Sequence, residues 1–272
     1  MKKYPIHFSI ILLFTIILIN RIPIPLYYFF DFDKITSDSL RKIIFNTIIL
    51  IGIYIIIKKN NIPFSFINLQ ISKKIIYYLP IIIYIIIFSG GLSNIDIKMD
   101  TVGRSTFFLF CIKIFISALL EEVLFRGLIL GLLLNKYFHL KDGILKSILI
   151  SSLLFGGIHI INIWTYSNLS IQGVFNQIYA ASCLGIMYGA IYLKTRSILL
   201  LSIFHFFANF FALSGELHKN DVITNINPIE PPLLQTIIAE IFRLIIFGIP
   251  LLVGFFVIKR IKKTEIIAII NK

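Results

Sequence analysis

The sequence predicts an all-α fold, a polytopic transmembrane helical bundle of about eight spans. Three observations predict it. Apolar residues make up 58% of the 272 positions, against about 45–50% in a soluble domain, and the mean hydropathy is +0.92. The excess lies in runs of Ile, Leu and Phe about 15–30 residues long, the length that an apolar helix needs to cross a bilayer. Apolar and polar residues do not alternate, as they would in a transmembrane β-strand.

The apolar runs define the elements in chain order. Spans are expected at residues 6–30, 42–57, 75–90, 105–134, 144–163, 171–193, 197–214 and 233–258. The first has a basic start but no small-residue cleavage site, so we expect a retained span rather than a signal peptide. The second is short, and residues 60–74 are polar enough to predict an amphipathic segment at the interface. No linker interrupts the chain, which predicts a single membrane domain over 1–272.

The Lys and Arg residues predict the orientation. With the N-terminus in the cytoplasm, 16 of the 26 lie in inner segments, 6 in outer segments and 4 within spans. By the positive-inside rule both termini are cytoplasmic. The same rule explains the net charge of +13, so the expected partner is the lipid bilayer and not nucleic acid. The bias toward Ile, Lys, Asn and Phe is typical of an AT-rich genome and favours a bacterial-type cell membrane.

Three charged residues lie inside the fourth span, in the stretch SALLEEVLFRG. Each charge costs about 2.5–3.5 kcal/mol at the centre of a membrane helix. Glu122 and Arg126 are spaced i,i+4, so they share a helix face and can pair. Glu121 is turned by about 100° from Glu122 and points elsewhere. A structural ion pair explains Glu122 and Arg126, but Glu121 needs a different explanation.

Two further same-face pairs lie inside later spans: Phe155 with His159, and His205 with Asn209. A rise of about 1.5 Å per residue puts Glu121, His159 and Asn209 each about 20 Å from the cytoplasmic end of its span, and His205 about 13 Å. A common depth is what a single buried site requires. Taken one at a time, each of these histidines is more often a satisfied interior residue than a site residue. The small-residue pairs Gly127/Gly131 and Gly185/Gly189 predict close packing.

The ordered set of motifs resembles a known family. It consists of Glu121-Glu122-x-x-x-Arg126-Gly127, Phe155-x-x-x-His159 and His205-x-x-x-Asn209. These look like the three motifs of the CPBP intramembrane proteases, a family that includes the type II CAAX prenyl endopeptidases and the bacterial Abi proteins of bacteriocin processing and immunity. The resemblance covers about residues 115–212, which would form the catalytic core.

The resemblance implies an endopeptidase whose nucleophile is an activated water molecule. Glu121 or Glu122 with His159 would activate the water, His205 and Asn209 would stabilise the oxyanion, and Arg126 would hold the glutamates. A carboxylate and an imidazole also suit proton transfer on chemical grounds, and a His/Asn pair suits an oxyanion. We favour a mechanism without a metal ion, because the HExxH pattern of zinc proteases is absent.

Zinc and two other function classes stay open as alternatives. Glu122, His159 and His205 would supply the three ligands of a catalytic zinc site. A non-catalytic scaffold or immunity protein would keep these residues for packing, and a proton-coupled transporter would use them as a relay. No inverted repeat supports the transporter. For a peptidase we expect a peptide or membrane-protein substrate, such as a bacteriocin leader or a signalling peptide.

Overall fold

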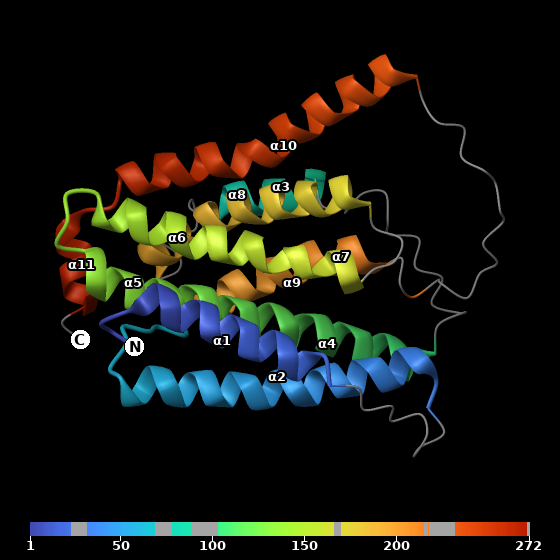
Figure 1. Ribbon diagram of the computed structural model, residues 1–272, viewed down its shortest axis with the longest axis horizontal. Helices are drawn as coiled ribbons and strands as arrows, with labels where there is room; N and C mark the ends of the chain where they lie inside the picture. The colour runs from blue at the N-terminus through green and yellow to red at the C-terminus, as the bar shows by residue number, and fades with distance from the viewer. Residues whose placement is uncertain are drawn as a thin grey trace.

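The computed structural model describes residues 1–22, 32–68, 78–88, 103–165, 170–214, 217 and 232–270. Within these ranges every regular element is helical, which confirms the predicted all-α class. The elements are α1 Pro5–Asn20, α2 Lys34–Lys59, α3 Leu79–Phe88, α4 Arg104–Glu122, the π-helical segment η3 Val123–Ile129, α5 Leu130–Tyr137, α6 Gly143–Gly157, the 3₁₀ turn η4 Ile158–Ile161, α7 Asn162–Thr165, α8 Ile171–Thr195, α9 Ile198–Leu213, α10 Leu233–Lys259 and α11 Lys263–Ile270. Most run along one long axis (Figure 1).

Four stretches of the described chain are long and apolar enough to cross a bilayer, so the protein is an integral membrane protein. They are Lys34–Lys59, Gly143–Thr165, Ile171–Thr195 and Leu233–Lys259. Each of the eight predicted ranges overlaps a helix, but the count of eight spans stays a prediction. Residues 96–100 and nearly all of 215–232, which lie between predicted spans, are outside the described residues.

Helix α2 corrects the prediction of a short second span, because it runs for 26 residues. Its start is set by Asp33, whose carboxylate accepts hydrogen bonds from the Thr36 backbone N–H at 2.9 Å and from the Thr36 hydroxyl at 2.6 Å. The first turns read as polar, yet Thr36, Ser37 and Ser39 are buried. Further along the same helix, the Asn46 amide donates a hydrogen bond to the Ser117 hydroxyl of α4 at 2.9 Å. Buried polar residues in the first turns therefore explain why the apolar run placed the start of this span at residue 42 instead of 34.

The fourth predicted span is one continuous helix from Arg104 to Tyr137, with the π-helical segment η3 in its middle. All seven residues of η3 are buried. Such segments are rare inside α-helices and are frequent at functional sites. Here the segment begins directly after Glu122 and contains Arg126, so the backbone irregularity coincides with the charged residues.

Close packing at the four predicted glycines is confirmed, but the partners differ. A Cβ atom on Gly185 would lie 2.9 Å from the Ser152 side chain of α6. One on Gly131 would lie 2.5 Å from Ile62, in the non-helical segment after α2. Ile62 and Phe64 thus pack against α5 and η3. The amphipathic segment predicted for 60–74 stays a prediction, and its residues 69–74 lie outside the described residues.

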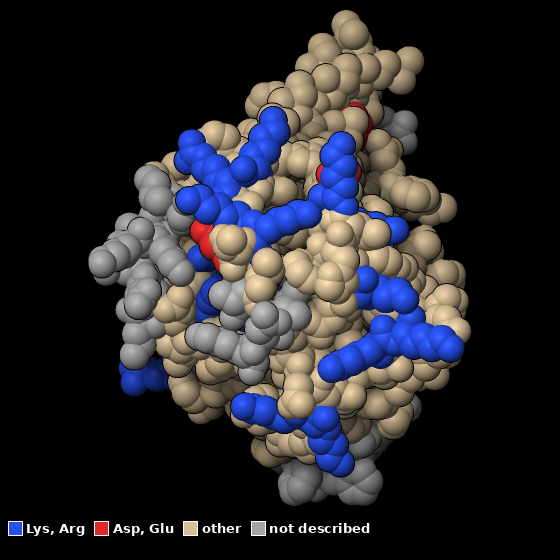
Figure 2. Space-filling model, turned by 90° about the vertical axis from the view of Figure 1, so that its left-hand side faces the viewer, with Lys and Arg blue, Asp and Glu red and all other residues tan. Residues whose placement is uncertain are grey.

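One end of the bundle carries most of the visible positive charge. Figure 2 shows Lys and Arg spread over this end, and Figure 1 shows the N-terminus and α11 at the same end. The last turns of four helices bring basic residues there: Lys58 and Lys59, Lys136, Lys194, and Lys259. This agrees with the predicted charge asymmetry. That this end faces the cytoplasm stays a prediction.

Candidate active site

The centre of the site is the ion pair that the i,i+4 spacing predicted. Arg126 Nη1 donates to Glu122 Oε1 at 3.1 Å. The Glu122 side chain is completely buried and that of Arg126 is 2% exposed. A buried charge is tolerated only when it is paired, so each of these residues depends on the other.

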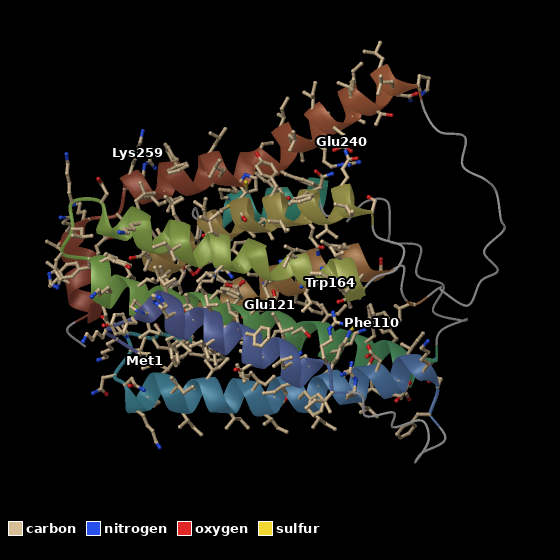
Figure 3. All side chains as sticks on the ribbon, in the orientation of Figure 1. Met1, Phe110, Glu121, Trp164, Glu240 and Lys259 are labelled. Carbon is tan, nitrogen blue, oxygen red and sulfur yellow. The ribbon has the colours of Figure 1, made fainter. Side chains whose placement is uncertain are left out.

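His205 of α9 joins this pair and contacts both glutamates. Its Nδ1 lies 2.8 Å from Glu122 Oε1, and its Nε2 lies 3.6 Å from Glu121 Oε2. The two glutamates differ in access, because the Glu121 side chain is 35% exposed and Glu122 is buried. Figure 3 shows Glu121 about midway along the bundle. The prediction that the two carboxylates face different surroundings is confirmed.

Phe155 of α6 connects the charged groups to the second histidine. Its ring lies 4.4 Å from the Arg126 guanidinium carbon, a cation–π contact. The same ring packs edge-on against His205 at 5.9 Å and against His159 at 5.6 Å between ring centroids. The Phe155-x-x-x-His159 motif therefore contributes an aromatic wall as well as an imidazole.

His159 lies in the turn η4, just after α6 ends. Its Nδ1 is 3.0 Å from the Phe155 carbonyl oxygen. A carbonyl can only accept, so Nδ1 carries a hydrogen and the neutral ring has its lone pair on Nε2. The His159 side chain is half-buried. The structure brings it to Phe155, but it is not among the described ion pairs that join His205 to the glutamates.

Asn209 follows His205 by four residues on α9 and is half-buried. Its amide takes no part in the hydrogen bonds that link Glu122, Arg126 and His205 in the described structure. His205 and Asn209 share one face of α9, but they are not two equivalent donors, because His205 already contacts both carboxylates.

The alternative zinc site does not fit this arrangement. Glu122 Oε1 accepts a hydrogen bond from Arg126 and faces His205 Nδ1 at 2.8 Å, so that oxygen and that nitrogen are directed at each other. Among the described residues, no group of three His, Cys, Asp or Glu side chains is arranged to hold a metal ion.

Tyr188 of α8 is a site residue that the sequence did not single out. Its ring lies 5.3 Å from the Arg126 guanidinium carbon and 5.8 Å from the His205 ring centroid. Arg126 thus has an aromatic contact with both Phe155 and Tyr188. The sequence did contain an indication of its position, because Tyr188 lies between Gly185 and Gly189, the two glycines that predict close helix packing.

The fold and the site define a class: a polytopic helical membrane protein with a buried carboxylate, imidazole and guanidinium cluster. Residues 103–211 match the family described as type II CAAX prenyl endopeptidase Rce1-like. The match includes every site residue from Glu121 to Asn209 and confirms the resemblance to the CPBP proteases, without distinguishing the Abi group. No curated protein and no solved structure matches the chain. This core therefore carries the signature of a membrane-embedded protease family.

Proposed function

We propose that the protein is an intramembrane endopeptidase that hydrolyses a peptide bond with a water molecule activated by Glu121. The observation that carries the proposal is the position of His205 between a buried glutamate and an accessible one, at 2.8 and 3.6 Å. Glu122 with Arg126 holds the imidazole from one side. Glu121 then keeps a carboxylate oxygen that a water molecule can reach.

Glu121 is the glutamate that activates the water, because its side chain is more exposed than that of Glu122. A Glu121 oxygen accepts a proton from the water as the water oxygen attacks the peptide carbonyl carbon. The His159 Nε2 lone pair can accept a hydrogen bond from the same water, because Nδ1 already donates to Phe155. Together they form the general base that amide hydrolysis requires.

Two residues of α9, His205 and Asn209, stabilise the oxyanion. His205 donates through Nε2 when it is protonated at both nitrogens, and the Asn209 amide lies one turn further along. With His205 protonated, Glu121, Glu122, Arg126 and His205 have no net charge, which favours the cluster in a medium of low dielectric. When the tetrahedral intermediate collapses, the C–N bond breaks and protonated Glu121 returns its proton to the leaving amine.

The substrate that suits this site is a membrane-embedded peptide segment. Both carboxylates lie on α4, which packs against the apolar helix α2, and this surrounding favours a substrate that enters from the bilayer. The Rce1-like match supports a peptide substrate. A bacteriocin leader or a signalling peptide is the substrate class that we propose.

The proposal is tested with purified protein in liposomes that also contain synthetic hydrophobic peptides, with the products identified by mass spectrometry. Variants Glu121→Gln, Glu122→Gln, His159→Gln and His205→Gln should lose cleavage. Glu240→Gln is the control, because Glu240 pairs with Arg243 on α10 and is not part of the cluster. Full cleavage by all four site variants would contradict the proposal.

Two further measurements separate the alternatives. A chelator should leave cleavage unchanged, whereas loss of cleavage and its recovery with zinc would favour the metal-dependent reaction. Proton flux in the same liposomes, lost in the Glu121→Gln variant, would favour a transporter. A scaffold would keep its cellular role in the Glu121→Gln variant.

A further inference from the structure

Three buried polar atoms around Arg126 have no hydrogen-bond partner in the described structure. They are Glu122 Oε2, Arg126 Nη2 and the Tyr188 hydroxyl. Their side chains are among the most buried in the protein, with Tyr188 only 1% exposed. Buried polar atoms are paired in the great majority of cases, so each exception calls for an explanation.

The three atoms belong to one neighbourhood. Arg126 Nη1 and Glu122 Oε1 are already joined at 3.1 Å. The unpaired Nη2 and Oε2 are each bonded to the same carbon as one of these atoms. The Tyr188 ring lies 5.3 Å from the guanidinium carbon. The set combines one acceptor, one donor, and one group that can do either.

We propose that these three atoms bind one internal water molecule, and that Tyr188 is through it a positioning residue for the pair of Glu122 and His205. The water accepts hydrogen bonds from Arg126 Nη2–H and the Tyr188 hydroxyl, and it donates one to Glu122 Oε2. Three partners are the usual number for a buried water. The activity part of this inference rests on the proposed peptidase function, but the binding part does not.

The packing of α8 explains why a tyrosine can serve here. A Cβ atom on Gly185 would lie 2.9 Å from Ser152, and one on Gly189 would lie 3.3 Å from Ile148. Both glycines thus let α8 approach α6, which carries Phe155. The Tyr188 ring lies 5.3 Å from the guanidinium carbon, on a helix that these two glycines hold close to α6.

The consequence concerns the second oxygen of Glu122. Its Oε1 accepts from both Arg126 and His205. A water on Oε2 fixes the rotation of the carboxylate, and so the direction in which Oε1 meets His205 Nδ1. Without that water, only the two bonds to Oε1 hold the carboxylate, and a small rotation of its plane changes the alignment of the imidazole toward Glu121.

The test compares Tyr188→Phe with Tyr192→Phe. Tyr192 is one turn further along α8 and equally buried, but its hydroxyl accepts from the Ser65 backbone N–H at 3.2 Å, away from the site. With ¹⁵N-labelled histidine, the His205 Nδ1 resonance reports its hydrogen bond to Glu122 and is assigned with a His205→Gln variant. Tyr188→Phe should shift this resonance and Tyr192→Phe should not. An unchanged resonance in Tyr188→Phe would overturn the inference, whether or not the protein proves to be a peptidase.

Activity gives the second readout. Tyr188→Phe keeps both ring contacts, so we expect kcat to fall about 10- to 100-fold from misalignment while KM changes little. If Tyr188→Phe does not fold, a high-resolution structure of the unaltered protein decides. Solvent density within hydrogen-bonding distance of all three atoms supports the inference. Direct bonding of the Tyr188 hydroxyl to another protein group, with no solvent there, overturns it.

Discussion

His205 Nδ1 lies 2.8 Å from Glu122 Oε1, the same oxygen that accepts a hydrogen bond from Arg126. One carboxylate oxygen therefore connects two helices, α4 and α9, at the depth of the buried cluster. The other imidazole nitrogen faces Glu121. This arrangement gives the adjacent glutamates different tasks, one structural and one chemical, and the two tasks can be separated experimentally.

The two glutamates should respond differently to the same substitution. Glu121→Gln should leave the free energy of unfolding within about 0.5 kcal/mol, because its side chain is partly exposed, while kcat falls about 100-fold or more. Glu122→Gln should destabilise the fold by about 3–5 kcal/mol, because Arg126 is left buried and uncompensated. Thermal unfolding in detergent and peptide cleavage measure the two effects. Equal destabilisation by both variants would contradict the division of tasks.

Restoring the charge balance should recover stability without activity. In a double-mutant cycle, Glu122→Gln with Arg126→Met should be more stable than the sum of the single changes predicts, by about 0.5–3 kcal/mol, yet remain inactive. The more exposed pair of Glu240 and Arg243 is the matched control, with an expected coupling of about 0–1 kcal/mol. The cycle is read from unfolding curves. A coupling as small as that of the control would mean that the buried pair is not energetically joined.

Two neighbouring glycines before His159 should behave in opposite ways. A Cβ on Gly156 would lie 1.9 Å from Ser182 Oγ and 2.6 Å from the Ile178 carbonyl oxygen, whereas one on Gly157 meets nothing within 4 Å. Gly156→Ala should destabilise by about 1–3 kcal/mol or more through overpacking. Gly157→Ala should be neutral or stabilise by up to about 1 kcal/mol, because alanine favours the helix. Melting temperatures of the two variants test this, and the reverse order would refute the packing of α6 on α8.

The start of α2 should be sensitive to acid. Burial raises the pKa of Asp33, but the hydrogen bonds from the Thr36 side chain and backbone outweigh it and hold the pKa below its usual value. The stabilisation is therefore present above the pKa of the unfolded chain and is lost as pH falls through the folded value. Asp33→Ala should cost about 1 kcal/mol at neutral pH and less in acid. A cost that does not change with pH would contradict the capping role.

The orientation is tested with single cysteines in a background of Cys111→Ser and Cys183→Ala. Lys141 and Lys34 are both exposed and lie on sides predicted to be inner and outer. Lys34→Cys should react with an impermeant thiol reagent added to intact cells. Lys141→Cys should react only after the membrane is opened. The opposite pattern would invert the topology.

The sequence by itself determined the helical class, the position of most helices and the pairing of Glu122 with Arg126. These follow from local properties: apolar runs of spanning length and an i,i+4 repeat are set by the chain within one element. It also marked Glu121, His159, His205 and Asn209 as unusual, because polar groups inside a membrane are costly.

Only the tertiary structure decided which of these groups meet. His205 contacts both glutamates, His159 is held by Phe155, and Tyr188 joins the cluster from a helix without a motif. The length of α2 was hidden for the same reason, since its polar first turns are buried against α4. Contacts between helices depend on the rotation and closeness that side chains and glycines allow at each interface. That information lies in pairs of distant positions, and no single run of the sequence contains it.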